Sequence, residues 1–200
     1  MKIDELHNIM PIVNIPSVTE HGILSHNLRK RKNISNHSVA LQDVQDLRAR
    51  KIVPVSGSTR GKPLHDFANL YFDAHNPMLS RVREHNSDIC VLCISPEVLN
   101  LPGVVITDRN AACDFVGFYS YPEELGKLDF EKIYATWWKH NDDPMLEGLH
   151  KNIKCAEALV PNVVEPKYIT SAYVCNKIAS DQLNKAGFSG NIIINSSLFF

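Results

Sequence analysis

The sequence predicts an α+β fold, with a mixed or antiparallel sheet and flanking helices. Short apolar runs of strand type outnumber the helical patterns, and most connections between them are short. The helical patterns fall mainly in the first half and again near the end, instead of alternating regularly with strands. A chain of 200 residues suits one domain, so we expect a single domain over residues 1–200.

The first third contains a strand, two helical stretches and a basic segment. Residues 3–13 favour a strand interrupted by Pro11, and a helix with Pro16 in its first turn follows and ends at Gly22. Residues 22–27 then predict a turn into a loop, which suits either a plain turn or close approach to a ligand. The next segment, RKRK at 29–32, is interpreted as a solvated loop or a phosphate-contacting patch. Residues 40–51 show helical spacing.

The middle of the chain reads as a loop followed by strands and a short helix. Residues 56–63 form a polar loop, and residues 64–72 alternate as a strand does. Asn76 and Pro77 are typical of a helix start, with the helix running from Met78 to Glu84. Residues 89–94 and 103–108 favour strands, and 108–112 a turn.

The last third is predicted to carry three further strands. Helix formers surround Asp129 and Glu131, and residues 140–144 are a polar loop. Strands are expected at 154–161, 169–175 and 191–195, with a helix at 177–186 that ends at Gly187.

Composition narrows the class of protein. The chain is 44% hydrophobic and 22% charged with a net charge of −1, which is ordinary for a soluble protein and favours no particular partner. The five cysteines show no disulfide spacing, which fits a reducing compartment. The Cys90-x-x-Cys93 pair lies inside a strand pattern, so we interpret it as two buried thiols and expect no metal site. No stretch approaches the ~18 apolar residues of a membrane span, and the N-terminus has no signal-peptide core. We therefore expect a cytoplasmic protein without a membrane contact.

The strand at 154–161 carries a single carboxylate, Glu157, inside an apolar run. Burying an ionised carboxylate is costly unless its charge is paired or used, so such a residue often marks a site. An edge strand with Glu157 facing water fits the same pattern. Periodicity alone leaves both interpretations open.

Six motifs taken together resemble the DarT family of bacterial DNA ADP-ribosyltransferase toxins. In order they are NIPSV (14–18), HGILSHN (21–27), LHDFANLYF (64–72), NPM (76–78), VITDRNAA (105–112) and KCAEALVP (154–161). The resemblance covers nearly the whole chain, and the order and spacing of the motifs carry it more than any single one.

The resemblance implies an ADP-ribosyltransferase fold with a split sheet and a cleft for NAD, without a metal. It further implies transfer of ADP-ribose to a base of single-stranded DNA, thymine or guanine, and a macrodomain hydrolase as antitoxin. The alternative is a relative that has lost catalysis and only binds nucleic acid or a partner protein, because a fold can be retained after its active site is lost. An RNA or protein acceptor is a third possibility.

The resemblance also implies site residues. The catalytic glutamate corresponds to Glu157, and the arginine before the flexible loop corresponds best to Arg48, with Arg50 as second choice. The early histidine of the family falls on Asn8 by counting and on His7 after a one-residue shift, and we favour His7. The expected NAD-binding residues are His7, Asn8, Ile9, Ser17, Gly22, Leu24 and Arg48. The expected DNA-binding residues are Arg29, Lys30, Arg31, Lys32, His75 and Trp137, with His75 standing where many relatives have arginine.

These residue types fit the chemistry. Cleavage of the nicotinamide–ribose bond builds positive charge on the ribose, as in glycoside hydrolysis, and a nearby carboxylate stabilises it. Arginine supplies a fork of donors for a pyrophosphate or positions the acceptor base. An unstacked base could lie on Trp137, Trp138 or Tyr71, although core packing is the better explanation for one of the two tryptophans.

Overall fold

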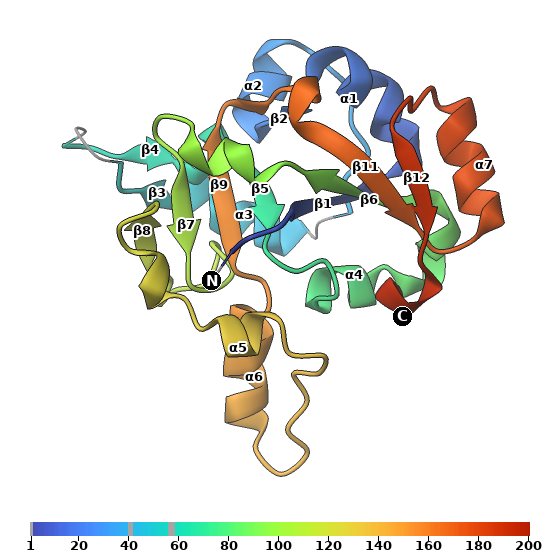
Figure 1. The fold of residues 1–200 in the computed structure, drawn as a ribbon. Helices are drawn as coiled ribbons and strands as arrows, with labels where there is room; N and C mark the ends of the chain where they lie inside the picture. Colours follow the sequence, from blue (N-terminus) through green and yellow to red (C-terminus); the bar gives the residue numbers. More distant parts are fainter. Residues whose placement is uncertain (1, 40–41, 56–58) are drawn as a thin grey trace.

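The computed structural model describes residues 2–39, 42–55 and 59–200 (Figure 1). Within these ranges eight strands form one sheet, in the order β12-β11-β6-β1-β5-β9-β7-β8. Their bounds are β1 Leu6–Pro11, β5 Phe67–Tyr71, β6 Ile89–Ile94, β7 Val105–Thr107, β8 Phe118–Ser120, β9 Glu157–Pro161, β11 Ile169–Val174 and β12 Asn191–Ile194. The β11–β12 pair is parallel and the other pairs in this sheet are antiparallel, which confirms the predicted mixed sheet.

Two short two-stranded sheets accompany the large one. One pairs β2 (Ile23–Leu24) with β10 (Val163–Val164), and the other pairs β3 (Ile52–Val53) with β4 (Lys62–Pro63). In Figure 1, β3 and β4 reach outward at the left of the molecule.

The helices surround the sheet. They are α1 Ile15–His21, α2 His26–Arg31, α3 Gln42–Arg50, α4 Pro77–Arg81, α5 Phe130–Ile133, α6 Pro144–Ile153 and α7 Lys177–Lys185. Figure 1 shows α1 and α2 together at one end, α7 beside β12, and α5 with α6 as a lobe that projects from the body. Among the described residues, none of the helices reaches the length and apolarity that crossing a bilayer requires.

Several helix ends follow the local sequence signals. The Asn76 side chain accepts hydrogen bonds from the backbone N–H groups of Met78 and Leu79 and begins α4, as predicted. Gly22 ends α1 with φ +76°, and a Cβ at this position would lie 2.2 Å from the Val164 carbonyl oxygen. Only glycine fits this turn, because the backbone of β10 passes directly against it.

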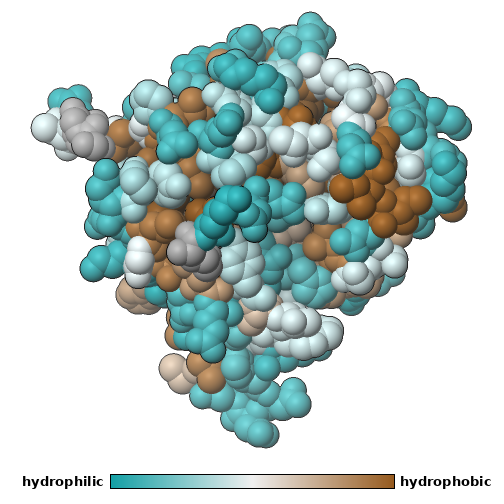
Figure 2. All heavy atoms as spheres, viewed as in Figure 1, coloured by the Kyte–Doolittle hydropathy of each residue, from teal (hydrophilic) through white to brown (hydrophobic). Residues whose placement is uncertain are grey.

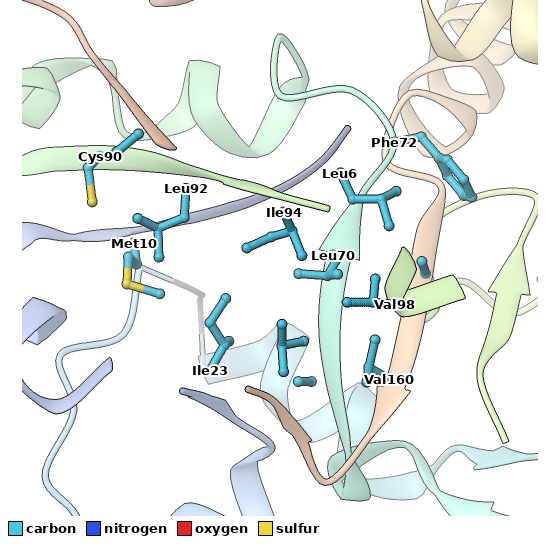
Figure 3. Packing of buried hydrophobic residues seen from close by; sticks show 14 of the residues in the cluster. Leu6, Met10, Ile23, Leu70, Phe72, Cys90, Leu92, Ile94, Val98 and Val160 are labelled. Carbon is cyan, nitrogen blue, oxygen red and sulfur yellow. The ribbon is translucent and has the colours of Figure 1, made fainter. Parts of the chain in front are cut away.

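The main hydrophobic core packs side chains of one face of the sheet with apolar side chains of α1 and α7, and Figure 3 shows part of it. Leu6, Leu70, Leu92 and Ile94 come from three adjacent strands and are fully buried there. Burying a side chain of this size stabilises the fold by about 1.5–3 kcal/mol. The visible outer surface is largely hydrophilic, with an apolar group of side chains in the region of β12, where Ile194 is exposed (Figure 2).

Two predictions about local structure were wrong. The basic segment 29–32 was expected in a loop, but Arg29–Arg31 form the last turn of α2, because the Ser25 side chain caps this helix at the Leu28 N–H. Helix α6 was missed, since its start in the expected polar loop is set by Asp143, whose side chain accepts from the Leu146 N–H. Residues 40–41 of the expected helix 40–51 and residues 56–58 of the expected polar loop lie outside the described residues.

Candidate active site

A cleft of about 1120 Å³ opens where the large sheet is split between β1 and β5. Within the described residues these strands share one register pair, His7 with Tyr71. Next along β1, the contact across the gap is made by a side chain, because Asn8 Nδ2 donates to the Asn69 carbonyl oxygen at 2.9 Å. The volume lies just above the range of about 300–1,000 Å³ that is usual for a small-molecule site.

Glu157 is the first residue of β9 and is 0% exposed. Arg48 Nη1 lies 3.1 Å from both of its carboxylate oxygens, and the Ala111 N–H donates to Oε1 at 2.8 Å. Its own N–H donates to Thr107 Oγ1 at 2.9 Å. Strand β9 lies inside the sheet between β5 and β7, so the edge-strand interpretation is wrong and the carboxylate is buried and paired.

Arg48 connects this carboxylate to the cleft. It is 8% exposed on α3 and lines the cleft, whereas Glu157 lies behind it. Arg50, the second choice, is exposed on the same helix. The structure therefore places the first-choice arginine beside the predicted catalytic carboxylate.

Tyr71 lies on β5, between β1 and the strand β9 that carries Glu157. It is paired across the sheet with Glu157 on one side and with His7 on the other, so the three side chains point to the same face. Burial, and then the negative charge of Glu157, raise the pKa of Tyr71 well above 10, which keeps its phenol neutral. Tyr71 also lines the cleft, next to Met78 and Cys155.

The sequence reasoning missed a stacked histidine pair. The rings of His26 and His65 lie along the cleft with centroids 4.2 Å apart and an interplanar angle of 24°. Burial, and then the charge of the neighbouring His65, lower the pKa of His26 from 6.5 to about 4. Burial, and then the positive charge of Arg48, lower the pKa of His65. His65 Nε2 is buried without a hydrogen-bond partner among the described residues.

This pair gives the fold a pH dependence. Because the pKa of both rings is lowered in the folded chain, to about 4 for His26, the folded chain takes up fewer protons below pH 6.5 than the unfolded chain does. Stability is therefore complete above about pH 6.5 and falls as the pH drops toward about 4. We expect the melting temperature to fall across this window and the His26→Gln variant to show a shallower fall. The exposed His85, changed to Gln, is the control and should leave the slope unchanged; equal slopes in wild type and His26→Gln would contradict the assignment.

The expected NAD-binding residues divide into two groups. Those along the cleft are Asn8, Ile9, Leu24 and Arg48. Those away from its lining are His7, Ser17 and Gly22. Of the two candidates for the early histidine position, Asn8 lines the cleft and His7 does not, so the preference for His7 stays a prediction. Gly22 serves the turn against β10.

The expected DNA-binding residues divide in the same way. Arg29 and Lys30 line the cleft, and Arg31 and Lys32 do not. His75 does not line it either, because its ring stacks on Phe200 at 4.1 Å and its Nδ1 lies 2.8 Å from the Leu198 carbonyl oxygen. Trp137 is 60% exposed and away from the lining, whereas Trp138 is 4% exposed and borders it. The expectation that one tryptophan packs in the interior is confirmed for Trp138.

Comparison with known proteins gives a consistent family assignment. A model of the family described as "ssDNA thymidine ADP-ribosyltransferase, DarT" matches residues 7–200. The chain is 31% identical over 201 residues to a DNA ADP-ribosyl transferase-DNA ADP-ribosyl glycohydrolase fusion protein of Thermosipho africanus, covering 98% of this chain and 49% of that protein. It is 30% identical over 165 residues to a DNA ADP-ribosyl transferase of Thermus sp., covering 78% of this chain and 73% of that protein. The chain thus spans about half the length of the first of these relatives.

Solved structures agree with the expected fold. Thermosipho africanus DarTG in complex with ADP-ribose superposes with a TM-score of 0.84 at 28% identity, over 98% of this chain and 51% of that chain. Thermus sp. 2.9 DarT in complex with ADP-ribosylated ssDNA gives 0.83 at 24% identity, over 99% and 97%. These likenesses confirm the α+β fold of the ADP-ribosyltransferase type.

Proposed function

The chain belongs to the DarT family of ssDNA thymidine ADP-ribosyltransferases, and we propose that it transfers ADP-ribose from NAD to thymine in single-stranded DNA and releases nicotinamide. The observation that carries the proposal is the buried carboxylate of Glu157, held by Arg48 and the Ala111 N–H behind a cleft of suitable size. A fold kept only for binding has no need to hold a buried carboxylate paired with an arginine inside its sheet.

Glu157 would act on the bond between ribose C1′ and the nicotinamide nitrogen. When this bond breaks, its electron pair leaves with nicotinamide and positive charge develops on the ribose. A carboxylate nearby stabilises that charge and can accept a hydrogen bond from a ribose hydroxyl. Thymine in DNA carries one ring N–H, so attack through this nitrogen releases a proton to Glu157 or to a second group.

Arg48 would orient the substrates. Its guanidinium lines the cleft and carries further donors beside the Nη1 that contacts Glu157, so it can hold a pyrophosphate oxygen or position the acceptor base while it stays near the carboxylate. Arg29 and Lys30 place two more positive charges along the same cleft, where phosphate groups of either substrate would be attracted.

We also propose a partner that reverses the reaction. The Thermosipho africanus relative is named as a fusion of a DNA ADP-ribosyl transferase with a DNA ADP-ribosyl glycohydrolase. A separate or linked glycohydrolase of this kind would act as the antitoxin of the present chain. The direct test of the function itself is incubation with NAD and mixed single-stranded oligonucleotides, followed by mass measurement of the products. Addition of one ADP-ribosyl group to thymine-containing strands is expected, and unmodified strands or label on protein would contradict it.

The DNA acceptor should be single-stranded, and its modification should depend on the salt concentration. A base inside a duplex is stacked and paired, so we expect activity on a single strand and its loss on the same sequence in duplex form. Neutralising Arg29, Lys30, Arg31 and Lys32 together should weaken use of DNA more than it weakens NAD binding, because only Arg29 and Lys30 of the four line the cleft. Activity should fall as salt rises, because the logarithm of the DNA affinity should fall with the logarithm of the salt concentration by roughly 0.7 per phosphate contact.

Two matched variants test whether only the cleft-lining end of this basic segment contacts DNA. Lys30 and Lys32 are both exposed, but of the two only Lys30 lines the cleft. Lys30→Gln should therefore reduce the salt slope by roughly 0.7, and Lys32→Gln should leave it closer to wild type. Equal activity on single strand and duplex would contradict the strand preference, and equal slopes for both variants would contradict the role of the cleft-facing end.

A further inference from the structure

The His7 ring does not line the cleft and is buried in a separate polar cluster. Its side chain is 9% exposed, and Nε2 lies 3.1 Å from Glu5 Oε1. Its other nitrogen, Nδ1, is buried and has no hydrogen-bond partner among the described residues. Leaving a buried polar atom unpaired destabilises a fold, so a partner that could occupy this position is worth seeking.

Cys93 completes the cluster. It lies directly opposite His7 on the neighbouring strand β6, so both side chains point to the same face. One ligand atom from each of Glu5, His7 and Cys93 lies within 4.8 Å of the others. Burial raises the pKa of the Cys93 thiol to about 12, and Tyr173 Oη donates to Glu5 Oε1 at 3.0 Å. The three donors come from the segment before β1, from β1 and from β6, so a bound ion would fasten them together.

We propose that Glu5, His7 and Cys93 form a binding site for a divalent transition metal of the zinc type. A carboxylate, an imidazole and a thiolate are a donor set that zinc accepts, with a fourth position for water. Tetrahedral zinc with bonds of about 2.0–2.3 Å holds its ligand atoms about 3.5 Å apart, so the three atoms, now within 4.8 Å of one another, would draw together on binding. Coordination would also deprotonate the thiol, because a metal-bound sulfur is a thiolate whatever its free pKa.

The inference differs from the sequence expectation of no metal for a geometric reason. The sequence suggests pairing Cys93 with Cys90, but residues three apart in a strand face opposite sides of the sheet. Cys90 packs in the main hydrophobic core, as Figure 3 shows, while Cys93 faces His7. The signal that could have found the site is the Glu5-x-His7 alternation, which puts both side chains on one face of an extended chain.

The test uses the whole purified chain, freed of metal with a chelator and titrated with Co²⁺ in place of zinc. Wild type should develop a near-ultraviolet band from thiolate-to-cobalt charge transfer, and zinc should displace it, because zinc and cobalt favour the same ligands. Cys93→Ser should lack the band. Cys90→Ser, a buried cysteine of the same strand on the other face, should keep it.

A second variant keeps the outcome readable if Cys93→Ser does not fold. Glu5 is half-buried, and Glu5→Gln should raise the Co²⁺ dissociation constant by at least about 10-fold, the lower end of what loss of even an outer-shell partner costs. Zinc should raise the melting temperature of wild type and not of Glu5→Gln. A band that persists in Cys93→Ser, or binding seen only at millimolar metal, would overturn the proposal. The measurement does not involve DNA modification, so its result does not depend on the proposed enzymatic function.

Discussion

Glu157→Gln should lower the rate of ADP-ribose transfer by about 10²–10³-fold, the range found when one group that stabilises transition-state charge is removed. Glutamine has the same shape and keeps an oxygen that can accept from the Ala111 N–H and from Arg48. What it loses is the negative charge next to the ribose. Growth inhibition in a bacterial host should disappear with the activity.

The choice of glutamine matters because the site is buried. Both variants remove the charge partner of Arg48, but Glu157→Ala also leaves Arg48 and the Ala111 N–H without an acceptor where there is little solvent, and losing one partner of a buried ion pair in this way costs about 3–5 kcal/mol. Loss of activity in the alanine variant could then come from unfolding. The measurement is single-turnover transfer to a labelled single strand, alongside the melting temperature, with the exposed Glu97→Gln as control. Transfer by Glu157→Gln at close to the wild-type rate would remove Glu157 from the mechanism.

The predictable part of the site was the strand that contains this carboxylate. A single charged residue inside an apolar run is visible locally, and so are the caps of α1 and α4. The groups that stabilise this charge could not be identified from the local sequence of the strand. Arg48 lies 109 residues away in sequence, and the other donor is the backbone N–H of Ala111, whose side chain carries no signal.

The choice between His7 and Asn8 shows a different limit. In a strand, a shift of one residue moves a side chain to the other face, so counting along a motif cannot decide between neighbours unless the register is known. The register here comes from the pairing of β1 with β6 and from its single described contact with β5. That pairing brings together segments far apart in the chain, and no local pattern at residues 6–11 encodes it.

Arg48→Ala should reduce both the activity and the stabilisation of the fold by NAD. NAD that binds only the folded state raises its stability by about 2.7 kcal/mol at 100 times the dissociation constant. Arg48 lines the cleft, so its loss should reduce the NAD-induced shift in melting temperature. Without NAD the variant should also melt earlier than wild type, because Glu157 is left buried with its charge unpaired.

Arg50→Ala is the matched control for this experiment. It removes the same side chain from the same helix at an exposed position, so helix propensity and net charge change equally in both variants. Arg48→Lys adds a second comparison, since lysine restores the charge without the planar fork of donors. If Arg48 acts through its fork, the lysine variant should recover the melting temperature of the free protein more than it recovers transfer. Equal NAD-induced shifts in melting temperature for Arg48→Ala and Arg50→Ala would contradict a role of Arg48 in NAD binding. Arg48 would then serve to hold Glu157 in place, and other groups along the cleft would bind the NAD phosphates. Arg29 and Lys30 would be the first to examine.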